Sequence, residues 1–351
     1  MTTQTDPSVF VLRGKTMVKI VLNRPRVLNS LNLEMIRLIQ QCLDEVEEDA
    51  SLQFVVFSGA GEKGFCAGGD IKALAQAIVD KKVMRPDLIL QEEYDLCLRL
   101  HHFPKPVVVL ADGITMGAGL GLAAGADIVL ATDRTRMAMP ETRIGFFPDV
   151  GATGWMFEKC PAGYPEYLGL TGYEMVGAEA VRVGFATHLV RGGNLDQCLE
   201  LLRDYTAPLP PERPPGARLL ADALEPFLEP HIPAKAEMDE WVASYFAGAH
   251  SVVEMLTSLR QCSIQTPLCE GVFFRLSERS PTALVLTLKL LRHNEGRPIE
   301  EVLQADLEAA RFMFAHHDYF EGVRARLIDK DDQPKWQPAT IEEVGPLKLE
   351  L

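Results

Sequence analysis

Residues 64–71, Gly64-Phe65-Cys66-Ala67-Gly68-Gly69-Asp70-Ile71, follow the short apolar run Phe54–Phe57 and lead directly into a predicted helix. The same order of strand, glycine-rich loop and helix returns at Pro106–Leu110 and Gly113–Leu122. This repeated alternation is typical of an α/β fold, in which ligands bind where loops leave the strand ends. Because glycine lets backbone N–H groups approach a ligand oxygen closely, both loops are candidate donors of amide hydrogen bonds.

Further strands and helices are predicted on both sides of these loops. Val9–Leu12 and Met17–Leu22 have the pattern of paired strands around a turn at Gly14-Lys15. Asn32 is a suitable N-cap, because apolar residues follow it at helical spacing. Glu92–His102 is predicted as a helix that stops before Pro104.

The texture of the sequence changes after about residue 205. Five prolines lie within Ala207–Gly216, which predicts a stiff linker or a boundary. Almost all residues beyond it have helical patterns, so we expect a core over residues 1–206 and a helical C-terminal region over residues 207–351. The candidate helices, with Ser280 and Asp318 as start signals, are Ala234–Phe246, Ser251–Arg260, Pro267–Ser277, Pro281–His293, Ile299–Phe314 and Glu321–Leu327.

The composition is that of an ordinary soluble globular protein, with 47% hydrophobic and 24% charged residues among 351. The formal net charge of -14 argues against general nucleic-acid binding but allows one anionic ligand held by local cations. No apolar run has membrane-spanning length, and the N-terminus carries neither a secretory nor an organelle-targeting pattern. Seven cysteines without a Cys-x-x-Cys pair favour reduced thiols, so a cytoplasmic protein is expected.

Two acids eight positions apart are the strongest chemical signal in the chain. Glu141 and Asp149 lie within Met139–Gly151 among apolar and conformationally restricted residues. Such surroundings suit carboxyl groups whose proton affinity is tuned by their environment. Two backbone donors facing such a pair would form an acyl-transfer or proton-transfer site.

Each of these residues also has an ordinary structural interpretation. Glu141 follows a proline and could be a first-turn carboxylate, while Asp149 could cap a helix that begins near Gly151. Glu93 lies on a predicted amphipathic helix and is by default a solvated charge. The glycine loops match neither a phosphate loop nor a dinucleotide fingerprint, and Cys66 is best interpreted as a small buried side chain.

Taken together, the motifs resemble the enoyl-CoA hydratase/isomerase (crotonase) superfamily over about residues 8–345. Phe147-Pro148-Asp149-Val150-Gly151 is similar to the 3-hydroxyisobutyryl-CoA hydrolase branch in particular. The other motifs that carry the resemblance are residues 64–71, 113–119 and 139–142 for the superfamily, and Glu92-Glu93-Tyr94, Thr171-Gly172-Tyr173, Glu321–Ala325, Asp329-Lys330-Asp331 and Pro334-Lys335-Trp336 for the branch.

The resemblance implies a fold and a set of site residues. The fold would be an α/β spiral of β-β-α turns, with the helical C-terminal region closing over the core. The Gly69 and Ala118 N–H groups would grip the thioester oxygen, although the branch commonly has glycine where Ala118 stands. Glu141 and Asp149 would be catalytic, Glu93 would contact the substrate, and the coenzyme A tail would pass near Ala67.

One departure from the superfamily pattern separates hydrolysis from hydration. A hydratase typically has one acid at the position of Glu141 and a second in the middle glycine loop, where this chain has Gly121. The resemblance therefore implies hydrolysis of a short branched 3-hydroxyacyl-CoA thioester, most simply 3-hydroxyisobutyryl-CoA in valine degradation. An enoyl-CoA hydratase or isomerase and a non-catalytic acyl-CoA binding homologue are the alternatives.

The same resemblance gives expectations about cofactors and partners. No metal or redox cofactor is expected, because coenzyme A is part of the substrate. The substrate is the expected partner, with neither nucleic acid nor membrane. The superfamily favours trimers and hexamers, which implies a homo-oligomer, but the helical C-terminal region leaves the oligomeric state open.

Overall fold

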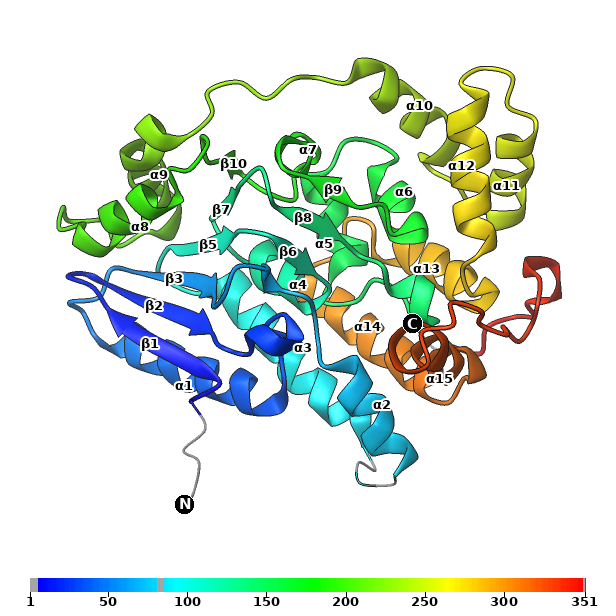
Figure 1. The fold of residues 1–351 in the computed structure, drawn as a ribbon, viewed down its shortest axis with the longest axis horizontal. Helices are drawn as coiled ribbons and strands as arrows, with labels where there is room; N and C mark the ends of the chain where they lie inside the picture. Colours follow the sequence, from blue (N-terminus) through cyan, green and yellow to red (C-terminus); the bar gives the residue numbers. More distant parts are fainter. Residues whose placement is uncertain (1–5, 81, 83–84, 350) are drawn as a thin grey trace. The chain divides into compact units, whose positions relative to one another are not determined.

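The computed structural model describes residues 6–80, 82, 85–349 and 351 (Figure 1). The chain forms two compact units, each built from three separate segments. Unit 1 consists of Met1–Gly69, Asp95–Met137 and Met175–Ala234, and unit 2 consists of Asp70–Tyr94, Ala138–Glu174 and Lys235–Leu351. The predicted boundary at residue 206 divides the chain by sequence pattern, and it stays a prediction.

Within the described residues, the strands form two sheets of mixed direction. The larger sheet has the order β1 (Val9–Arg13), β2 (Met17–Leu22), β3 (Phe54–Gly59), β5 (Val107–Ala111), β7 (Ile128–Ala131) and β10 (His188–Leu189). β1 and β2 pair antiparallel, whereas β2–β3, β3–β5, β5–β7 and β7–β10 pair parallel. The smaller sheet has the order β4 (Gly64–Cys66), β6 (Ile114–Met116), β8 (Arg136–Ala138) and β9 (Met175–Val176).

Consecutive strands alternate between the two sheets. β3, β5 and β7 join the larger sheet, and the strand after each of them, β4, β6 or β8, joins the smaller one. A helix or helical turn follows each pair: α2 (Ile71–Val79), α4 (Ala118–Ala124) and η2 (Glu141–Ile144). The repeated β-β-α turn predicted for this chain is therefore present, and both glycine-rich loops lie between a strand of the smaller sheet and a helix.

The other regular elements of the described chain are helices and short helical turns. They are α1 (Leu33–Glu48), α3 (Pro86–His102), α5 (Ala152–Lys159), α6 (Tyr164–Thr171), α7 (Ala178–Val183), α8 (Leu195–Asp204), α9 (Arg213–Leu224), α10 (Ala236–Phe246), α11 (Val252–Arg260), α12 (Thr266–Ser277), α13 (Pro281–Asn294), α14 (Ile299–Phe314) and α15 (His317–Val323), with η1 (Pro25–Val27), η3 (Glu225–Phe227), η4 (Arg324–Ile328) and η5 (Ile341–Glu343) as short turns. None of the described helices is long and apolar enough to cross a membrane.

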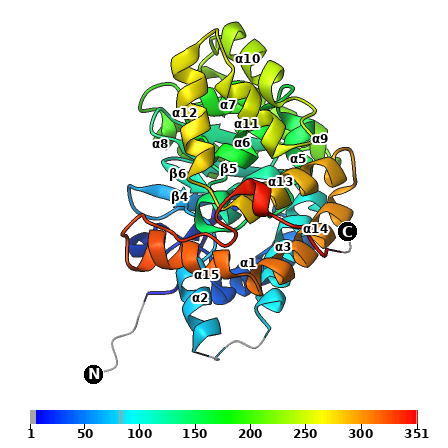
Figure 2. The same ribbon diagram turned by 90° about the vertical axis from the view of Figure 1, so that its right-hand side faces the viewer.

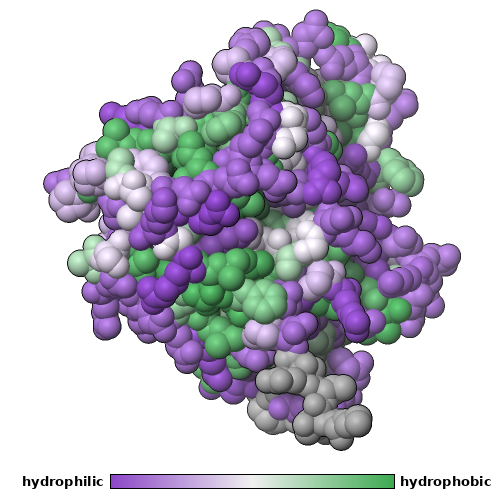
Figure 3. Space-filling view, turned by 60° about the vertical axis from the view of Figure 1, so that its left-hand side comes forward, coloured by the Kyte–Doolittle hydropathy of each residue, from purple (hydrophilic) through white to green (hydrophobic). Residues whose placement is uncertain are grey.

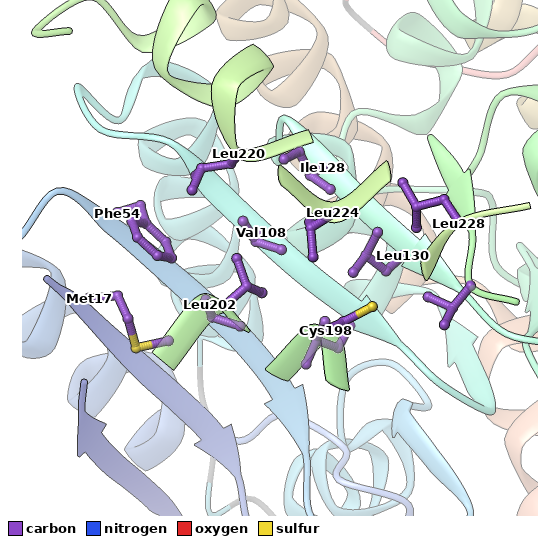
Figure 4. Close-up of a cluster of buried hydrophobic side chains, with 13 residues drawn as sticks. Met17, Phe54, Val108, Ile128, Leu130, Cys198, Leu202, Leu220, Leu224 and Leu228 are labelled. Carbon is purple, nitrogen blue, oxygen red and sulfur yellow. The ribbon is translucent and has the colours of Figure 1, made fainter. Parts of the chain in front are cut away.

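One face of the larger sheet is covered by α8 and α9 of the same unit (Figure 4). Side chains such as Phe54, Val108 and Leu130 from the strands meet Leu202 and Leu220 from the helices, and all are fully buried. Burying one such side chain contributes about 1.5–3 kcal/mol relative to leaving it in water. The sheet whose strands lead toward the glycine-rich loops therefore rests on a well-packed layer.

Only the first part of the proline-rich stretch Ala207–Gly216 is a linker. α9 begins at Arg213, so Pro214 and Pro215 form its first turn, where proline needs no N–H partner. The Arg213 guanidinium donates to Asp127 at 2.8 Å and to Leu100 O at 2.8 Å, which fixes the start of the helix. The prediction of a linker over all of Ala207–Gly216 is wrong for its second half.

Two details near the C-terminus also differ from the predictions. The predicted helix Glu321–Leu327 is instead α15 followed by the π-helical turn η4. His316 caps α15 through its side chain, whereas the Asp318 carboxylate accepts hydrogen bonds from Ser280 and from Gln337 N–H. Asp318 is therefore not the helix start signal, because its oxygens hold other segments.

The cysteines depart from the prediction at one pair. Cys262 and Cys269 form a disulfide, with Cα atoms 6.4 Å apart. The bond joins the connection after α11 to the first turn of α12, two helices that Figure 2 labels. The expectation of reduced thiols is wrong for this pair because the loop brings the two close together. The free cysteines among the described residues are Cys42, Cys66, Cys97, Cys160 and Cys198.

The face seen in Figure 3 is largely hydrophilic, with separate hydrophobic patches. The excess of acidic residues in the sequence is consistent with such a surface. On the edge strand β1, Val11 and Leu12 are 44% and 53% exposed. Isolated exposed apolar residues of this kind are normal for a folded protein.

Candidate active site

The first glycine-rich loop lies in unit 1 and leaves β4 with a fixed backbone. Gly68 has a φ of +106°, which L-residues with side chains rarely adopt. The Ala67 N–H donates to Leu28 O at 3.0 Å, and Gly68 O accepts from the Leu31 N–H at 2.9 Å. The backbone is thus held immediately before Gly69, the first predicted oxyanion donor.

The second loop of unit 1 ends where α4 begins. Gly117 precedes the helix with a φ of +49°, and Ala118 is its first residue and 3% exposed. A Cβ added to Gly68 would lie 3.7 Å from the Ala118 nitrogen. The backbones of the two loops therefore approach each other closely, and N–H groups in the first turn of a helix have no acceptor within that helix.

Glu141 opens η2 in unit 2, directly after Pro140. It is 8% exposed, and its Oε2 has no hydrogen-bond partner among the described residues. Burial raises the pKa of Glu141 well above its ordinary value, and the charge of Asp149 raises it further. A buried carboxyl oxygen without a hydrogen-bond partner is costly to the fold, which is typical of a functional residue.

Asp149 precedes a tight turn in the same unit. Its backbone oxygen accepts from the Ala152 N–H at 2.9 Å, and the two residues between them, Val150 and Gly151, have φ values of +51° and +78°. A β-branched residue at positive φ is strained, so the surrounding structure must hold this turn in place. The expected helix near Gly151 does begin there, as α5 at Ala152.

Helix α3 carries the third predicted acid and an unpredicted tyrosine. Glu93 is 5% exposed, so its interpretation as a solvated charge is wrong. Burial raises the pKa of Glu93 to about 8, with Asp149 contributing. Beside it, the Tyr94 hydroxyl donates to Asp149 Oδ2 at 2.9 Å.

Asp149 is the most acidic member of this group. Burial raises the pKa of Asp149 to about 6, because the hydrogen bond from Tyr94 offsets part of the effect of burial. Burial and the Asp149 charge together raise the pKa values of Glu141 and Asp306 well above the usual range. Asp149 therefore ionises at a lower pH than Glu93, and its negative charge is what opposes ionisation of the acids around it.

Aromatic side chains exclude water from this part of unit 2. Phe146 stacks on Phe147 with ring centroids 4.5 Å apart, and it also contacts Phe314 and Tyr319 at 5.9 and 5.6 Å. Tyr319 is fully buried, and its pKa is raised by burial and by Asp149. The aromatic cluster therefore supplies the low-dielectric surroundings that make the acids reluctant to ionise.

The structure groups the predicted residues within each unit. In unit 1, Gly69 and Ala118 lie on two neighbouring loops, with Ala67 on the first of them. In unit 2, Glu141, Asp149 and Glu93 are all buried, and Asp149 raises the pKa of each of the other two. Among the described residues, no cluster of three or more His, Cys, Asp or Glu side chains is arranged to bind a metal.

We call Glu93, Glu141, Asp149 and Asp306, together with Tyr94, the acid cluster. The sequence motifs assigned no role to the side chains of Tyr94 and Asp306. Tyr94 directly follows Glu93 in the motif Glu92-Glu93-Tyr94, and this position beside a predicted substrate contact is a sequence signal for Tyr94. Asp306 lies between Leu303 and Ala310 on the buried face of α14 and is itself 0% exposed. A charged residue inside an apolar helical stripe is unusual, and this pattern could have identified it.

A family model described as enoyl-CoA hydratase/isomerase matches residues 17–350 of this chain. The protein of Mus musculus named 3-hydroxyisobutyryl-CoA hydrolase, mitochondrial, is 38% identical over 334 residues, covering 93% of this chain and 83% of that protein. The protein of the same name from Gallus gallus is 36% identical over 335 residues, with 93% and 83% covered.

Solved structures give a similar result. A carnitinyl-CoA dehydratase from Mycobacterium thermoresistibile has a TM-score of 0.84 and 31% identity, covering 97% of this chain and 94% of that one. An enoyl-CoA hydratase from Rhodobacter sphaeroides 2.4.1 has a TM-score of 0.80 and 29% identity, with 97% and 95% covered. Both likenesses extend over almost the whole chain.

Proposed function

Because this chain belongs to the enoyl-CoA hydratase/isomerase family and has the crotonase fold, we propose that it hydrolyses 3-hydroxyisobutyryl-CoA. Water and the thioester would give 3-hydroxyisobutyrate and free coenzyme A. The relatives named 3-hydroxyisobutyryl-CoA hydrolase support this assignment through their 36–38% identity over most of the chain.

The observation that carries the proposal is the buried pair of Glu141 and Asp149. Both lie at most 8% exposed in one unit, and the charge of Asp149 raises the pKa of Glu141. The middle glycine loop instead has the buried Gly121 in α4, without a carboxyl group. Acidic side chains are thus concentrated around Asp149, as hydrolysis by a carboxylate and a partner acid requires.

In the first step, negative charge develops on the thioester oxygen. The Gly69 and Ala118 N–H groups donate to this oxygen, and a donor of this kind typically contributes about 3–4 kcal/mol to the transition state. Both donors belong to the backbone, so the methyl group of Ala118 leaves the chemistry unchanged.

Glu141 supplies the carboxylate that drives the reaction. As a nucleophile it would attack the thioester carbon, release the coenzyme A thiolate and leave a mixed anhydride that water then hydrolyses. As a general base it would take a proton from water, which attacks the same carbon directly. A single turnover in ¹⁸O-labelled water tests the nucleophilic route. If water attacks the Glu141 carbonyl carbon of the mixed anhydride, the label appears in the Glu141 carboxyl group. The general-base route places the label only in the product acid.

Asp149 and Glu93 complete the substrate contacts in this proposal. Asp149 carries the charge that positions the attacking water or accepts the 3-hydroxyl proton, held by Tyr94 at 2.9 Å. Glu93 keeps its proton at neutral pH and donates it in a hydrogen bond to the 3-hydroxyl. The coenzyme A tail passes along the first loop near Ala67, which is partly exposed. No metal or redox cofactor takes part.

Release of thiol from 3-hydroxyisobutyryl-CoA tests the function. Wild-type protein should release thiol at a rate proportional to enzyme concentration, and Glu141→Gln should release almost none while binding with similar affinity. Isobutyryl-CoA, which lacks only the hydroxyl group, should react more slowly. A Glu141→Gln variant with near-full activity would contradict the mechanism.

Hydration of an enoyl-CoA is the second candidate, because solved structures named as a dehydratase and a hydratase have 31% and 29% identity. Loss of the enoyl absorbance of crotonyl-CoA would support it. Binding of coenzyme A thioesters without either reaction would instead indicate a non-catalytic homologue.

A place in valine degradation follows from the proposed substrate. The relatives named above are described as mitochondrial, whereas cytoplasmic localisation of this chain stays a prediction from its sequence. A homo-oligomer also stays a prediction, which sedimentation velocity would test.

A further inference from the structure

We propose that Asp306 is a positioning residue for Asp149, acting through the backbone of the Asp149–Gly151 turn. The inference rests on the proposed function, because that function gives Asp149 its role. Asp306 Oδ2 accepts a hydrogen bond from the Gly151 N–H at 2.8 Å, and the two residues are 155 positions apart in the chain.

The turn needs such an anchor because its own backbone is strained. Val150 has a φ of +51°, which β-branched residues seldom adopt, and Gly151 continues with +78°. Strain of this kind persists only where neighbouring groups hold it. The Trp155 indole N–H donates to Val150 O at 3.2 Å, so a residue of α5 holds the Val150 carbonyl group.

Helix α14 also packs tightly against the same turn. A Cβ added to Gly151 would meet Ile299 Cδ1 at 2.5 Å and Leu303 Cδ2 at 3.6 Å. Ile299, Leu303 and Asp306 follow the i, i+4, i+7 spacing of one helical face. The hydrogen bond from Gly151 to Asp306 is therefore flanked by the apolar side chains of Ile299 and Leu303, which pack against Gly151.

The same helix holds the segment that carries the other acid-cluster residues. Arg311 Nε donates to Asp87 Oδ2 at 3.0 Å, and Asp87 lies in the first turn of α3, about two turns before Glu93 and Tyr94. Asp87 is 5% exposed and also binds Arg85. α14 thus contacts both the Asp149 turn and the helix whose tyrosine donates to Asp149.

Asp306 could instead act through its charge or only by filling space, without any role for its hydrogen bond to Gly151. Asp306 Oδ2 accepts from the Gly151 N–H, whereas Oδ1 is buried without a hydrogen-bond partner among the described residues. Asparagine has nearly the shape of aspartic acid and keeps a side-chain oxygen that can accept from the Gly151 N–H, but it carries no charge. Asp306→Asn therefore preserves the contact to Gly151, whereas Asp306→Leu removes it and keeps a similar volume.

The experiment compares these two variants with wild-type enzyme and with Glu301→Gln, a control that removes an exposed acid from the same helix. We expect Asp306→Leu to lower kcat about 100-fold with KM within about twofold. Asp306→Asn should remain within about threefold of wild type. Thermal unfolding shows that each protein is folded, which is expected because leucine suits this buried apolar face.

Amide hydrogen exchange at Gly151 gives a readout that does not depend on turnover. We expect exchange to accelerate at least about tenfold in Asp306→Leu and to stay near wild type in Asp306→Asn. Equal kcat values for Asp306→Leu and wild type, or unchanged Gly151 exchange, would overturn the inference. Absence of thiol release by wild type would reject the proposed function instead, and the exchange result would still decide whether Asp306 anchors the turn.

Discussion

The glycine-rich loops of unit 1 and the acid cluster of unit 2 differ in which groups would act on the substrate: backbone in the first, side chains in the second. In unit 1 the predicted donors are backbone N–H groups, whose positions depend on glycine geometry at Gly68 and Gly117. In unit 2 the working groups are side chains, buried against their own preference for water. We therefore expect unit 1 to tolerate side-chain changes that leave its backbone in place, whereas unit 2 should depend on the identity of each acid.

Removing the acid at position 141 should produce the largest effect. Glu141→Gln keeps the shape of the side chain but can neither attack nor accept a proton, so kcat should fall about 1,000-fold or more. Thiol release under saturating substrate measures this, with Glu301→Gln as a matched charge-neutralising control. A loss below about tenfold would assign the attacking group elsewhere.

A side chain added at position 119 should break unit 1 by moving its backbone. In Gly119→Ala the new Cβ would overlap the Cys66 carbonyl oxygen, so β4 and the start of α4 must separate. We expect a loss of about 100-fold in kcat, because the Ala118 amide would be displaced. Gly271→Ala, where a Cβ meets open space, is the control for the substitution itself. Full activity in Gly119→Ala would show that these loops do not depend on close packing.

The acids of unit 2 should cost stability, which Glu93→Gln will reveal. The folded pKa of Glu93 is raised from 4.5 to about 8, so the folded state binds more protons than the unfolded state between these values. Stability of wild type therefore falls as pH rises through this window, and the glutamine variant avoids the loss. We expect a gain of about 3 kcal/mol at pH 7.

Urea unfolding at pH 5 and pH 7 tests the sign of this effect. The difference between Glu93→Gln and wild type should shrink at the lower pH, and Glu301→Gln, which removes an exposed acid, should change little at either. A variant less stable than wild type at pH 7 would mean that Glu93 is satisfied in the fold.

Loss of the tyrosine hydroxyl should change the pH dependence of activity. The hydrogen bond from Tyr94 lowers the pKa of Asp149, so Tyr94→Phe should raise that pKa above about 6. The acid limb of the kcat/KM profile should move to higher pH, with about a tenfold loss near pH 6 and a smaller one at pH 8. An unchanged profile would separate Asp149 ionisation from catalysis.

The smallest effect is expected for Ala118→Gly. The N–H group at position 118 remains, and only a methyl group in a buried position is removed. We expect kcat within about twofold of wild type, since the donor is the backbone. A change above about tenfold would show that the methyl group itself shapes the site.

The sequence predicted the repeated elements of this fold well, because their signals are local. The strand Met17–Leu22 and the helix Ile299–Phe314 agree with the structure at both ends. The Ala207–Gly216 linker failed because an interaction far away in the sequence, between Arg213 and Asp127, starts a helix inside it. Family membership and fold, which the motifs implied, are confirmed by the family model and the solved structures.

The site was predictable only in part. Glu141 and Asp149 could be found because they share one motif, and they stay predictions as catalytic residues. The burial of Glu93 could not be found, since an amphipathic helix does not reveal which of its charges face inward. The apolar helical pattern around Asp306 indicates that its side chain is buried, but the sequence does not reveal its partner, because Gly151 is 155 residues away.

That long separation has a consequence during protein synthesis. The Asp149–Gly151 turn leaves the ribosome well before the helix that anchors it, by roughly 10–30 s for 155 residues at ordinary elongation rates. During this interval the nascent chain carries the strained turn and its acids without Asp306. A nascent chain therefore cannot complete this site until Asp306 has been made, 155 residues after Gly151.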